Sequence, residues 1–465
     1  MKRNPFKQAS GSNGGAVREI VNAILVAVFL VATIGAFASR ASAADAIPKP
    51  DLDSLPVVDS SLVPMRAVTR GPKFHWFGYY NKDQIDSTGR YLLAMQVDFE
   101  HRSPTADDKV TIGMVDLEDG DRWIELAESR AWNWQQGCMV QWRPGSATEV
   151  LFNDRDGDQF VCRVLDVKTG KTRTLPMPIE HVTADGKRAV CSDYRRIQYI
   201  RPGYGYAGLP DPNRDILAPN DVGAWVMDME TGETRLVVSI AQLVAIPYSN
   251  ATSKDKHYLN HFEWNADGTR FLMFNRWVGG VPGQPTRVFT AADTRPQGKD
   301  GQAIHGTRDT GQANRDSDVR LLSKWGASHW VWRDAEHVLF WGLGGYKLYK
   351  DDGSGQPKET LWIAPNGHES YIPGTENQWL VTDTYPRGPR REQTLYLFHL
   401  PTSRVVVLGR FASPKEYSGE WRCDLHPRAT RDGKHIVIDS PHGGDGRQQY
   451  LFDIGRLVGE GRNGD

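Results

Sequence analysis

Short runs of apolar residues, or of alternating apolar and polar residues, follow one another along most of the chain. Examples are RYLLAMQVDF, FVCRVLDV, GAWVMDM, RFLMFNRW and HIVIDS. Gly, Pro, Asn or Asp bounds each run, which is typical of β-strands separated by turns. No long helical periodicity occurs after residue 43. The pattern therefore predicts an all-β chain.

Two turn motifs alternate along the chain and divide it into repeats. The first closes a strand with Asp and a tight turn, in DLEDG, DVKTG, DMETG and the weaker HLPTS, which begin at Asp116, Asp166, Asp228 and His399. The second leads into a strand, with its turns at Gly89, Gly145, Gly186, Gly268, close to Glu336, close to Thr375 and at Gly433. These seven units predict a seven-bladed β-propeller of four-stranded antiparallel blades over residues 73–458. An array of β-sandwiches with ordinary Asp-Gly turns is the alternative.

Two segments are longer than a blade requires. Residues 193–221 are aromatic, basic and rich in Pro and Gly, and residues 278–318 are polar. We expect both to be insertions, and the second to be mobile. Insertions on a rigid scaffold are frequent carriers of function.

The N-terminus has the pattern of a secretory signal. Basic residues precede an apolar run over residues 20–38, and Ala41-Ser42-Ala43 fits a small-x-small cleavage site. The cleavage motif favours export to the periplasm or medium over a retained N-terminal anchor. We therefore expect a signal over residues 1–43, a linker or pinned segment over 44–72 and a disordered tail over 459–465.

The net charge and the cysteines bear on binding to nucleic acids or membranes and on the presence of disulfides. A formal net charge of -1 gives no global field for nucleic acid or for an acidic membrane. Four cysteines permit disulfides in an exported chain, with Cys138–Cys162 the most plausible pair. Free buried thiols are the favoured interpretation, because a chain of this size has no need of a disulfide framework.

Four histidines occupy one register of the repeats. They stand in HFEW, HWVW, HESY and HPRA, as His261, His329, His368 and His426. Equivalent positions of propeller blades surround one axis, so these imidazoles should meet at one mouth of the central channel. Such a group predicts a Zn or Mn site. The alternative is that the four histidines are structural residues, each of which forms a hydrogen bond with a backbone group.

Further metal ligands lie beside the histidines in sequence. Asp383 in VTDTYP, and Cys423 or Asp424 in RCDLHP, are candidates because carboxylates and thiolates complete such sites. The second unit, MVQW, has Met139 where the later blades have histidine. The predicted site is therefore confined to blades four to seven.

Several motifs together resemble one family. QGCMVQW, RPGYGY, NHFEWNADGTRFLMFNRW, SHWVW, VTDTYP and RCDLHPRATRDGKHIVIDS resemble segments of the seven-bladed polysaccharide lyases, namely the oligogalacturonate lyases and ulvan lyases. The resemblance spans residues 73–455. Similar WNADG signatures also occur in non-enzymatic TolB-like propellers, so the resemblance supports the fold more strongly than the activity.

The resemblance implies β-elimination on an acidic poly- or oligosaccharide that contains uronic acid. Such a reaction needs a base, an acid and a cation that neutralises the uronate carboxylate. In oligogalacturonate lyases a metal held largely by histidines takes the neutralising role, whereas in ulvan lyases the metal is structural. By this resemblance Tyr204 and Tyr206 are candidate base or acid, and Arg201 and Arg276 are candidate carboxylate partners.

The chain also departs from what such an enzyme needs. Met139 and Gln159 occupy positions where a catalytic histidine would be useful, and neither side chain can transfer a proton. A non-catalytic propeller that binds glycan or envelope proteins is therefore the second hypothesis, and a metal-dependent hydrolase the third.

Overall fold

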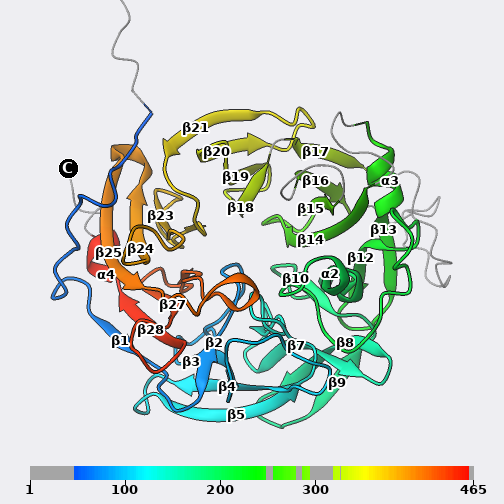
Figure 1. Ribbon diagram of the computed structural model, residues 1–465, viewed down its shortest axis with the longest axis horizontal. Coiled ribbons are helices and arrows are strands. Elements are labelled where there is room, and N and C mark those ends of the chain that lie inside the picture. Colours follow the sequence, from blue (N-terminus) through cyan, green and yellow to red (C-terminus); the bar gives the residue numbers. More distant parts are fainter. Residues whose placement is uncertain (1–46, 248–254, 279–284, 294–317, 325, 460–465) are drawn as a thin grey trace, which may run out of the picture. The chain divides into compact units, whose positions relative to one another are not determined.

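The described strands of the computed structural model form seven four-stranded antiparallel sheets in a ring, which is a seven-bladed β-propeller (Figure 1). The structure describes residues 47–247, 255–278, 285–293, 318–324 and 326–459. The predicted signal over residues 1–43 lies outside these ranges. Among the described residues, no helix has the length and apolar character needed to cross a membrane.

Blades one to four each take consecutive strands, with the first strand nearest the axis. Their bounds are β2 (Phe74–Trp76), β3 (Tyr91–Val97), β4 (Val110–Asp116) and β5 (Arg122–Ser129); β6 (Gln141–Trp142), β7 (Glu149–Asp156), β8 (Gln159–Asp166) and β9 (Thr172–Leu175); β10 (Ile179–Val182), β11 (Arg188–Cys191), β12 (Gly223–Asp228) and β13 (Thr234–Ser239); and β14 (Lys256–Trp264), β15 (Arg270–Val278), β16 (Thr286–Ala292) and β17 (Val319–Ser323).

Blades five and six follow the same order, and blade seven borrows its outer strand. Their bounds are β18 (Ala327–Trp332), β19 (His337–Gly342), β20 (Gly345–Lys350) and β21 (Pro357–Ile363); β22 (Ser370–Tyr371), β23 (Trp379–Thr382), β24 (Glu392–His399) and β25 (Arg404–Ala412); and β26 (Arg428–Ala429), β27 (His435–Ser440), β28 (Gln448–Asp453) and β1 (Met65–Ala67). The described helical segments are short: α2 (Tyr194–Ile200), α3 (Ile240–Ala245), α4 (Gly455–Gly459), η2 (Leu400–Thr402) and η3 (Gly419–Trp421).

Strand β1 closes the ring. Met65 pairs with Phe452 and Ala67 with Tyr450, so the N-terminal side of the chain completes the C-terminal blade. The segment that precedes β1 also contacts the propeller, since the amide of Ile363 donates to the carbonyl of Pro48. The sequence allowed either a linker or a pinned segment here, and residues 48–67 are the pinned segment.

The turn motifs fall where a four-stranded blade needs them. All seven loop-to-strand turns join the first and second strands of a blade, and the Asp turns join the third and fourth. Gly186 has a φ of 71°, and a Cβ there would meet the carbonyl oxygen of Pro144 in the preceding blade at 2.1 Å. Gly433 meets Pro373 of blade six in the same way. The glycines therefore serve both the turn and the packing between blades.

One expectation was wrong. Residues 278–318 are not a single polar insertion, because they contain β16, the third strand of blade four. Six of its seven residues are buried, including Thr286, Arg287 and Thr290. Arg287 escapes the usual penalty because its Nη2 donates to Asn275 Oδ1 and to the carbonyl of Leu243. Because β16 contains polar residues that are buried with hydrogen-bond partners, the pattern of apolar residues did not indicate a strand there.

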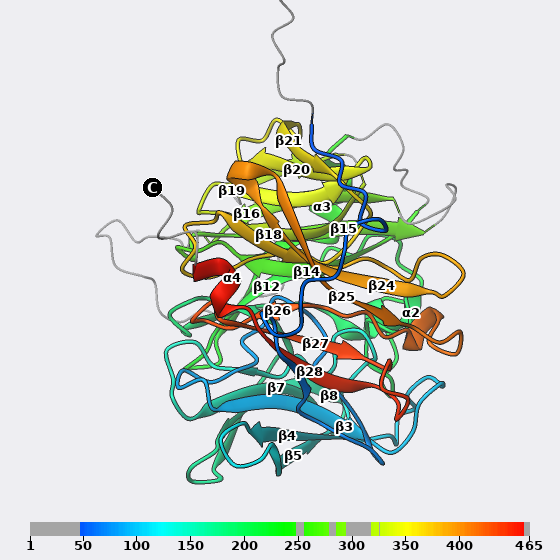
Figure 2. The same cartoon turned by 90° about the vertical axis from the view of Figure 1, so that its left-hand side faces the viewer.

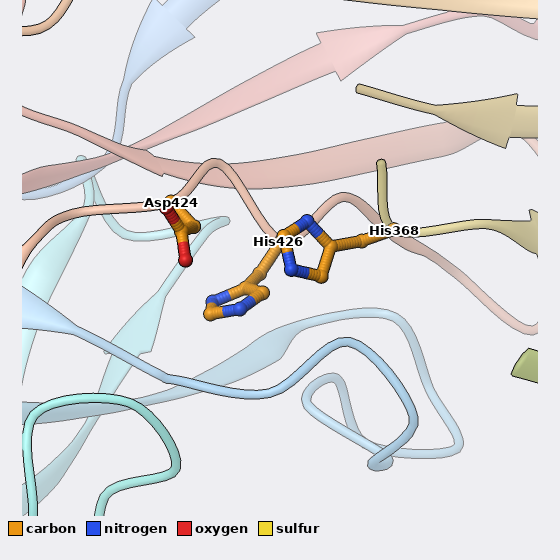
Figure 3. A group of neighbouring side chains, drawn as sticks. All are labelled: His368, Asp424 and His426. Atoms are coloured by element: carbon orange, nitrogen blue, oxygen red, sulfur yellow. The ribbon is translucent and has the colours of Figure 1, made fainter. Parts of the chain in front are cut away.

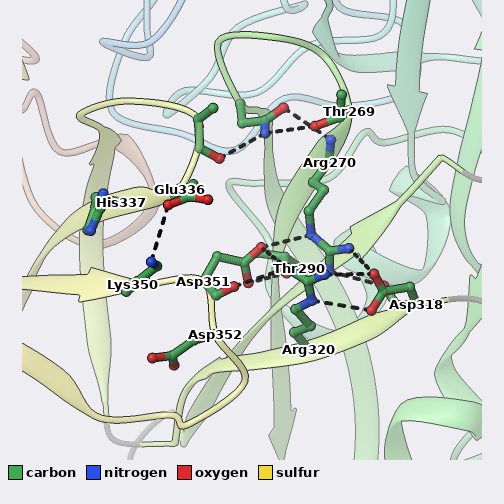
Figure 4. Close-up of polar contacts among 12 residues, drawn as sticks. Thr269, Arg270, Thr290, Asp318, Arg320, Glu336, His337, Lys350, Asp351 and Asp352 are labelled. Atoms are coloured by element: carbon green, nitrogen blue, oxygen red, sulfur yellow. Dashed lines mark hydrogen bonds and ion pairs between the residues drawn. The ribbon is translucent and has the colours of Figure 1, made fainter.

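Blades four and five are joined by a buried ionic network (Figure 4). Arg270 on β15 pairs with Asp351 at 2.8 Å and with Asp318 at 2.6 Å. Thr290 donates to the other oxygen of Asp351 at 2.7 Å. The side chain of Asp351 is 2% exposed, so solvent screens this network little.

We expect Asp351→Ala to lower the free energy of unfolding by about 3 kcal/mol, because it leaves the Arg270 charge under-compensated in the interior. The neighbouring Asp352 pairs with Lys358 across a far more exposed surface. Asp352→Ala is therefore the matched control, with an expected loss below ~1 kcal/mol. Denaturant midpoints of the two variants check this, and equal shifts would contradict a special role of the network.

Candidate metal and anion site

The four in-register histidines lie within or just before the innermost strands of blades four to seven. His261 and His329 stand at irregularities of β14 and β18, and His368 and His426 directly precede β22 and β26. His261 and His426 have φ values of 59° and 43°, and Met139, at the equivalent place in blade two, has 57°. A left-handed backbone at a non-glycine residue is uncommon, so this shared feature marks one register.

Three of the four imidazoles form a row, in which His368 contacts both His329 and His426. The ring centroids of His329 and His368 lie 4.0 Å apart, and those of His368 and His426 lie 4.3 Å apart. His261 stands to one side, because the ring of Tyr79 stacks on it at 5.2 Å and also contacts His426 at 5.3 Å. The structure thus brings together three of the four histidines, with Tyr79 between them and the fourth.

His368, Asp424 and His426 form a group that can hold a metal ion (Figure 3). One ligand atom from each residue lies within 4.8 Å of the others. Nε2 of His368, Nε2 of His426 and Oδ1 of Asp424 are all buried, and none has a hydrogen-bond partner in the described part of the chain. Buried polar atoms are rarely left unsatisfied. Two imidazoles and a carboxylate with unsatisfied atoms are a ligand set that can hold a divalent cation.

Neighbouring groups orient these three side chains. Asp383 contacts Nδ1 of His368 at 2.9 Å, which assigns the proton to Nδ1 and leaves the lone pair on Nε2. Arg422 donates to Oδ2 of Asp424 at 2.7 Å, which leaves Oδ1 free. Gly367 allows the close approach of the two chain segments, since a Cβ there would lie 1.8 Å from the carbonyl oxygen of Asp383. Asp383 therefore orients the ring of His368 and lies outside the group of three.

Cys423 lies in the interior, outside this group. Burial raises the pKa of its thiol far above the usual range. All four cysteines are buried and free of disulfides, Cys138 and Cys162 included. A thiol that stays protonated is a poor metal ligand, because the thiolate is the coordinating form.

Tyr204 lies within a group of arginines beside His261. The guanidinium of Arg201 covers its ring at 4.0 Å, Arg422 donates to its hydroxyl at 2.6 Å, and His261 packs edge-on at 5.5 Å. Burial raises the pKa of Tyr204, but the charges of Arg422 and Arg201 outweigh burial and hold it below its ordinary value. The tyrosinate of Tyr204 therefore forms more readily than that of an exposed tyrosine.

Arg201 and Arg276 each present an unused donor. Nη1 of both side chains is buried without a hydrogen-bond partner in the described residues. Neither forms an ion pair with a described carboxylate, and Arg276 makes a side-chain hydrogen bond to Thr286. Burial and repulsion from Arg201 lower the pKa of Arg276. Arg276 is buried and Arg201 half-buried, and two such cations without a described counter-ion can accept an anion.

The structure separates Tyr206 from Tyr204. The ring of Tyr206 stacks on Tyr194 at 4.0 Å, and its hydroxyl accepts a hydrogen bond from Asn153 at 3.0 Å. Burial raises its pKa well above the usual value. Helix α2, which carries Tyr194, begins the insertion over residues 193–221 and lies towards one face of the ring, with α4 towards the other (Figure 2). Tyr206 anchors this insertion, and Tyr204 lies beside the histidines.

Two residues of this site were absent from the sequence-based candidates. Tyr385 contacts Nε2 of His329 at 3.4 Å through its hydroxyl, and its ring lies 5.6 Å from His368. Burial and the charge of Asp424 raise the pKa of Tyr385. The other is Arg422, which joins Asp424 to Tyr204. Both stand inside motifs already singled out, VTDTYP and RCDLHP, so proximity to Asp383 and His426 was the available signal.

Other histidines do not approach Tyr204 in the described contacts. His75 bonds Gln448 and Gln96, His257 stacks on Trp277, and His181 contacts the amide of Trp264. Met139 is part of the hydrophobic core. Gln159 is exposed at the start of β8. His261 is thus the imidazole that contacts Tyr204.

Comparisons with known proteins support the fold. No family model and no curated protein sequence matches the chain. Among solved structures, the oligogalacturonate lyase of Vibrio parahaemolyticus superposes with a TM-score of 0.56 at 12% identity, over 86% of this chain and 95% of that one. TolB of Acinetobacter baumannii matches 79% of this chain and 81% of its own at 12% identity and a TM-score of 0.33. The tricorn protease matches 87% of this chain and 35% of its own at 10% identity and a TM-score of 0.46. At these identities the likeness shows a propeller fold.

Proposed function

We propose that the chain is an exported lyase that cleaves glycans containing uronic acid by β-elimination. The observation that carries the proposal is the meeting of two unpaired guanidinium groups with Tyr204 beside the His368, Asp424 and His426 group. The architecture shared with an oligogalacturonate lyase is consistent with this assignment. The N-terminal pattern supports a periplasmic or secreted location.

The residues divide the reaction as follows. Nη1 of Arg201 and of Arg276 bind the uronate carboxylate and stabilise the negative charge that develops on it. Tyr204, as tyrosinate, removes the proton from C5. The electron pair of that bond forms the C4–C5 double bond, and the bond from C4 to the glycosidic oxygen breaks. Tyr385 donates its proton to the departing oxygen.

The opposite pKa shifts of the two tyrosines support this division. A base must be ionised before the reaction and an acid must be protonated, so their environments should move their pKa values apart. Arginine charges lower the pKa of Tyr204 in spite of its burial, whereas burial and Asp424 raise that of Tyr385. Nδ1 of His329 faces Oδ1 of Asn366, so its Nε2 is the acceptor that orients the Tyr385 hydroxyl, and water restores the proton of Tyr385 after each turnover.

His368, Asp424 and His426 are the residues that would hold a divalent ion such as Zn²⁺ or Mn²⁺. Bound there, such an ion supplies positive charge next to the anion site and stabilises the carboxylate as charge builds up on it. Asp383 fixes the ring of His368 for this purpose, and Arg422 fixes Asp424.

The direct test is to incubate the purified chain with oligogalacturonate, ulvan and glycosaminoglycans and to follow the ultraviolet absorbance of the unsaturated uronate. We expect this absorbance to rise with at least one substrate. Reducing ends without the unsaturated product would indicate a hydrolase. Glycan binding without any product would favour the non-catalytic propeller.

We expect Arg276→Met to lower kcat/KM about 10²-fold or more on the substrate that this assay identifies, because a donor to the developing charge is lost. The same variant should keep or raise the free energy of unfolding, since it removes a buried cation that lacks a counter-ion. Arg195→Met, which removes a half-exposed arginine paired with Asp193, is the control. Full activity of Arg276→Met would exclude it from the anion site.

A further inference from the structure

A cavity of about 510 Å³ lies at the end of the channel where the turns between the first and second strands of the blades gather. All seven blades line it, through residues such as Lys82, Gln141, His181, Glu263, Tyr371 and Arg431. Glu263 follows His261 by two residues within β14, and the segment from His368 enters β22 and reaches Tyr371. None of the four in-register histidines lines the cavity. Its volume is typical of small-molecule sites.

Two tyrosines separate this cavity from the histidine end. The hydroxyl of Tyr80 donates to the carbonyl of Trp330 and accepts from its amide, both at 2.9 Å. Tyr80 lines the cavity, while its ring contacts His368 at 5.5 Å on the other side. Tyr79 packs against Tyr80 at 4.8 Å, and both are buried. The two sites are therefore distinct, and a ligand of the second needs no role in glycan cleavage.

The floor of the cavity holds an ammonium and a carboxylate that do not neutralise each other directly. Asn81 lies between them, since its Oδ1 accepts from Nζ of Lys82 at 2.7 Å and its Nδ2 donates to Oε2 of Glu263 at 2.9 Å. Trp330 donates to the same Oε2 at 2.6 Å. Within the described residues, Lys82 forms no ion pair, and Oε1 of Glu263 has no hydrogen bond. Each charged group thus keeps unused bonding capacity.

The other residues that line the cavity are paired charges and aromatic side chains. At the rim, Arg431 and Asp83 already satisfy each other at 2.6 Å, so neither supplies a free charge. Trp264 and Tyr371 add aromatic surface. Burial lowers the pKa of Lys82, an effect that the charges of Glu180 and Glu263 only partly offset. Nζ of Lys82 makes one described side-chain hydrogen bond, to Asn81, so it keeps N–H donors for a ligand carboxylate.

We infer that this cavity binds a small zwitterion of the α-amino acid class. The ligand carboxylate accepts from Nζ of Lys82, and the ligand ammonium donates to Oε1 of Glu263. The side chain of the ligand packs against Trp264 and Tyr371. A simple anion would face Glu263 without compensation, and a simple cation would face Lys82, so a ligand with both charges fits better than either.

The test is calorimetric titration of the full chain with the standard L-amino acids, and with the deamino and decarboxy analogues of the best binder. We expect at least one amino acid to bind, and each single-charge analogue to bind about 10-fold more weakly or worse, since one charge-assisted hydrogen bond is lost. Lys82→Met and Glu263→Gln should each weaken binding by a similar factor.

Lys82→Arg retains the charge and should retain binding, which separates loss of the site from loss of folding. Glu128→Gln, on the exposed outer strand of blade one, is the control for a lost carboxylate. The inference is overturned if no amino acid binds, if the analogues bind as tightly as the parent, or if galacturonate competes in preference to amino acids. Unchanged affinity in both Lys82→Met and Glu263→Gln would overturn it as well.

Discussion

The His426→Ala variant is expected to lose the bound metal ion, from about one per chain to none by elemental analysis of the purified protein. The expectation follows from the three buried polar atoms that lack a described partner in His368, Asp424 and His426. Removing one of only three protein ligands leaves a pair of side chains that cannot compete with water for the ion. Activity that depends on the ion should fall in parallel.

Burial and the neighbouring His368 keep the pKa of His426 well below its usual value. The ring therefore stays neutral, and able to coordinate, as the pH falls past ~6.5, where an exposed histidine would be protonated. We expect metal retention of the wild-type chain to persist below that pH. Early loss of the ion near the ordinary histidine pKa would contradict a site built on buried rings.

Two further variants separate a ligand from other histidines and carboxylates. His442→Ala removes a half-buried histidine of the same blade that bonds Ser440, and it should keep the full metal content. Asp383→Asn should bind the ion about 10- to 100-fold more weakly, because Asp383 orients His368 from behind. An unchanged number of metal ions per chain in His426→Ala would show that the ion binds at other residues.

Turn chemistry explains why the blade count was predictable. A tight turn that needs a left-handed backbone restricts the residue to glycine in most blades, and this leaves a periodic mark in the sequence. β1 and β16 left no such mark. β1 is three residues long and pairs with a strand more than 380 residues away in the chain, as Ala67 with Tyr450. The polar residues of β16 are buried with their hydrogen-bond partners.

From the sequence, only those site residues that occupy equivalent positions of the repeats could be predicted to lie together. The shared register of His368 and His426 follows from the repeat, and the two rings do meet. Which of Arg422, Cys423 and Asp424 joins the two histidines depends on the direction in which each side chain leaves an irregular loop. The repeat period of the sequence carries no information on that direction. Tyr204 and Tyr206 are a similar case, because two alternate residues of one insertion end in different surroundings.

Replacing Tyr204 with phenylalanine is expected to lower kcat about 10²- to 10⁴-fold, the usual contribution of a positioned proton-transfer group. Its effect on KM should be small, because Arg201 and Arg276 still bind the carboxylate. In the wild-type chain, kcat/KM should rise with pH as Tyr204 loses its proton, and level off below the ordinary tyrosine pKa of ~10. The Tyr204→Phe variant should lose this rising limb.

Tyr206→Phe is the matched control, two residues away in the same insertion. Its hydroxyl accepts one hydrogen bond from Asn153, so its removal should cost about 1 kcal/mol of stability and leave the pH profile unchanged. A structural role of Tyr204 would make the two variants alike, since each would then lose only packing and a hydrogen bond. A rising limb that survives in Tyr204→Phe would assign the base to another group, and His261, which contacts the Tyr204 ring, would be the next to replace.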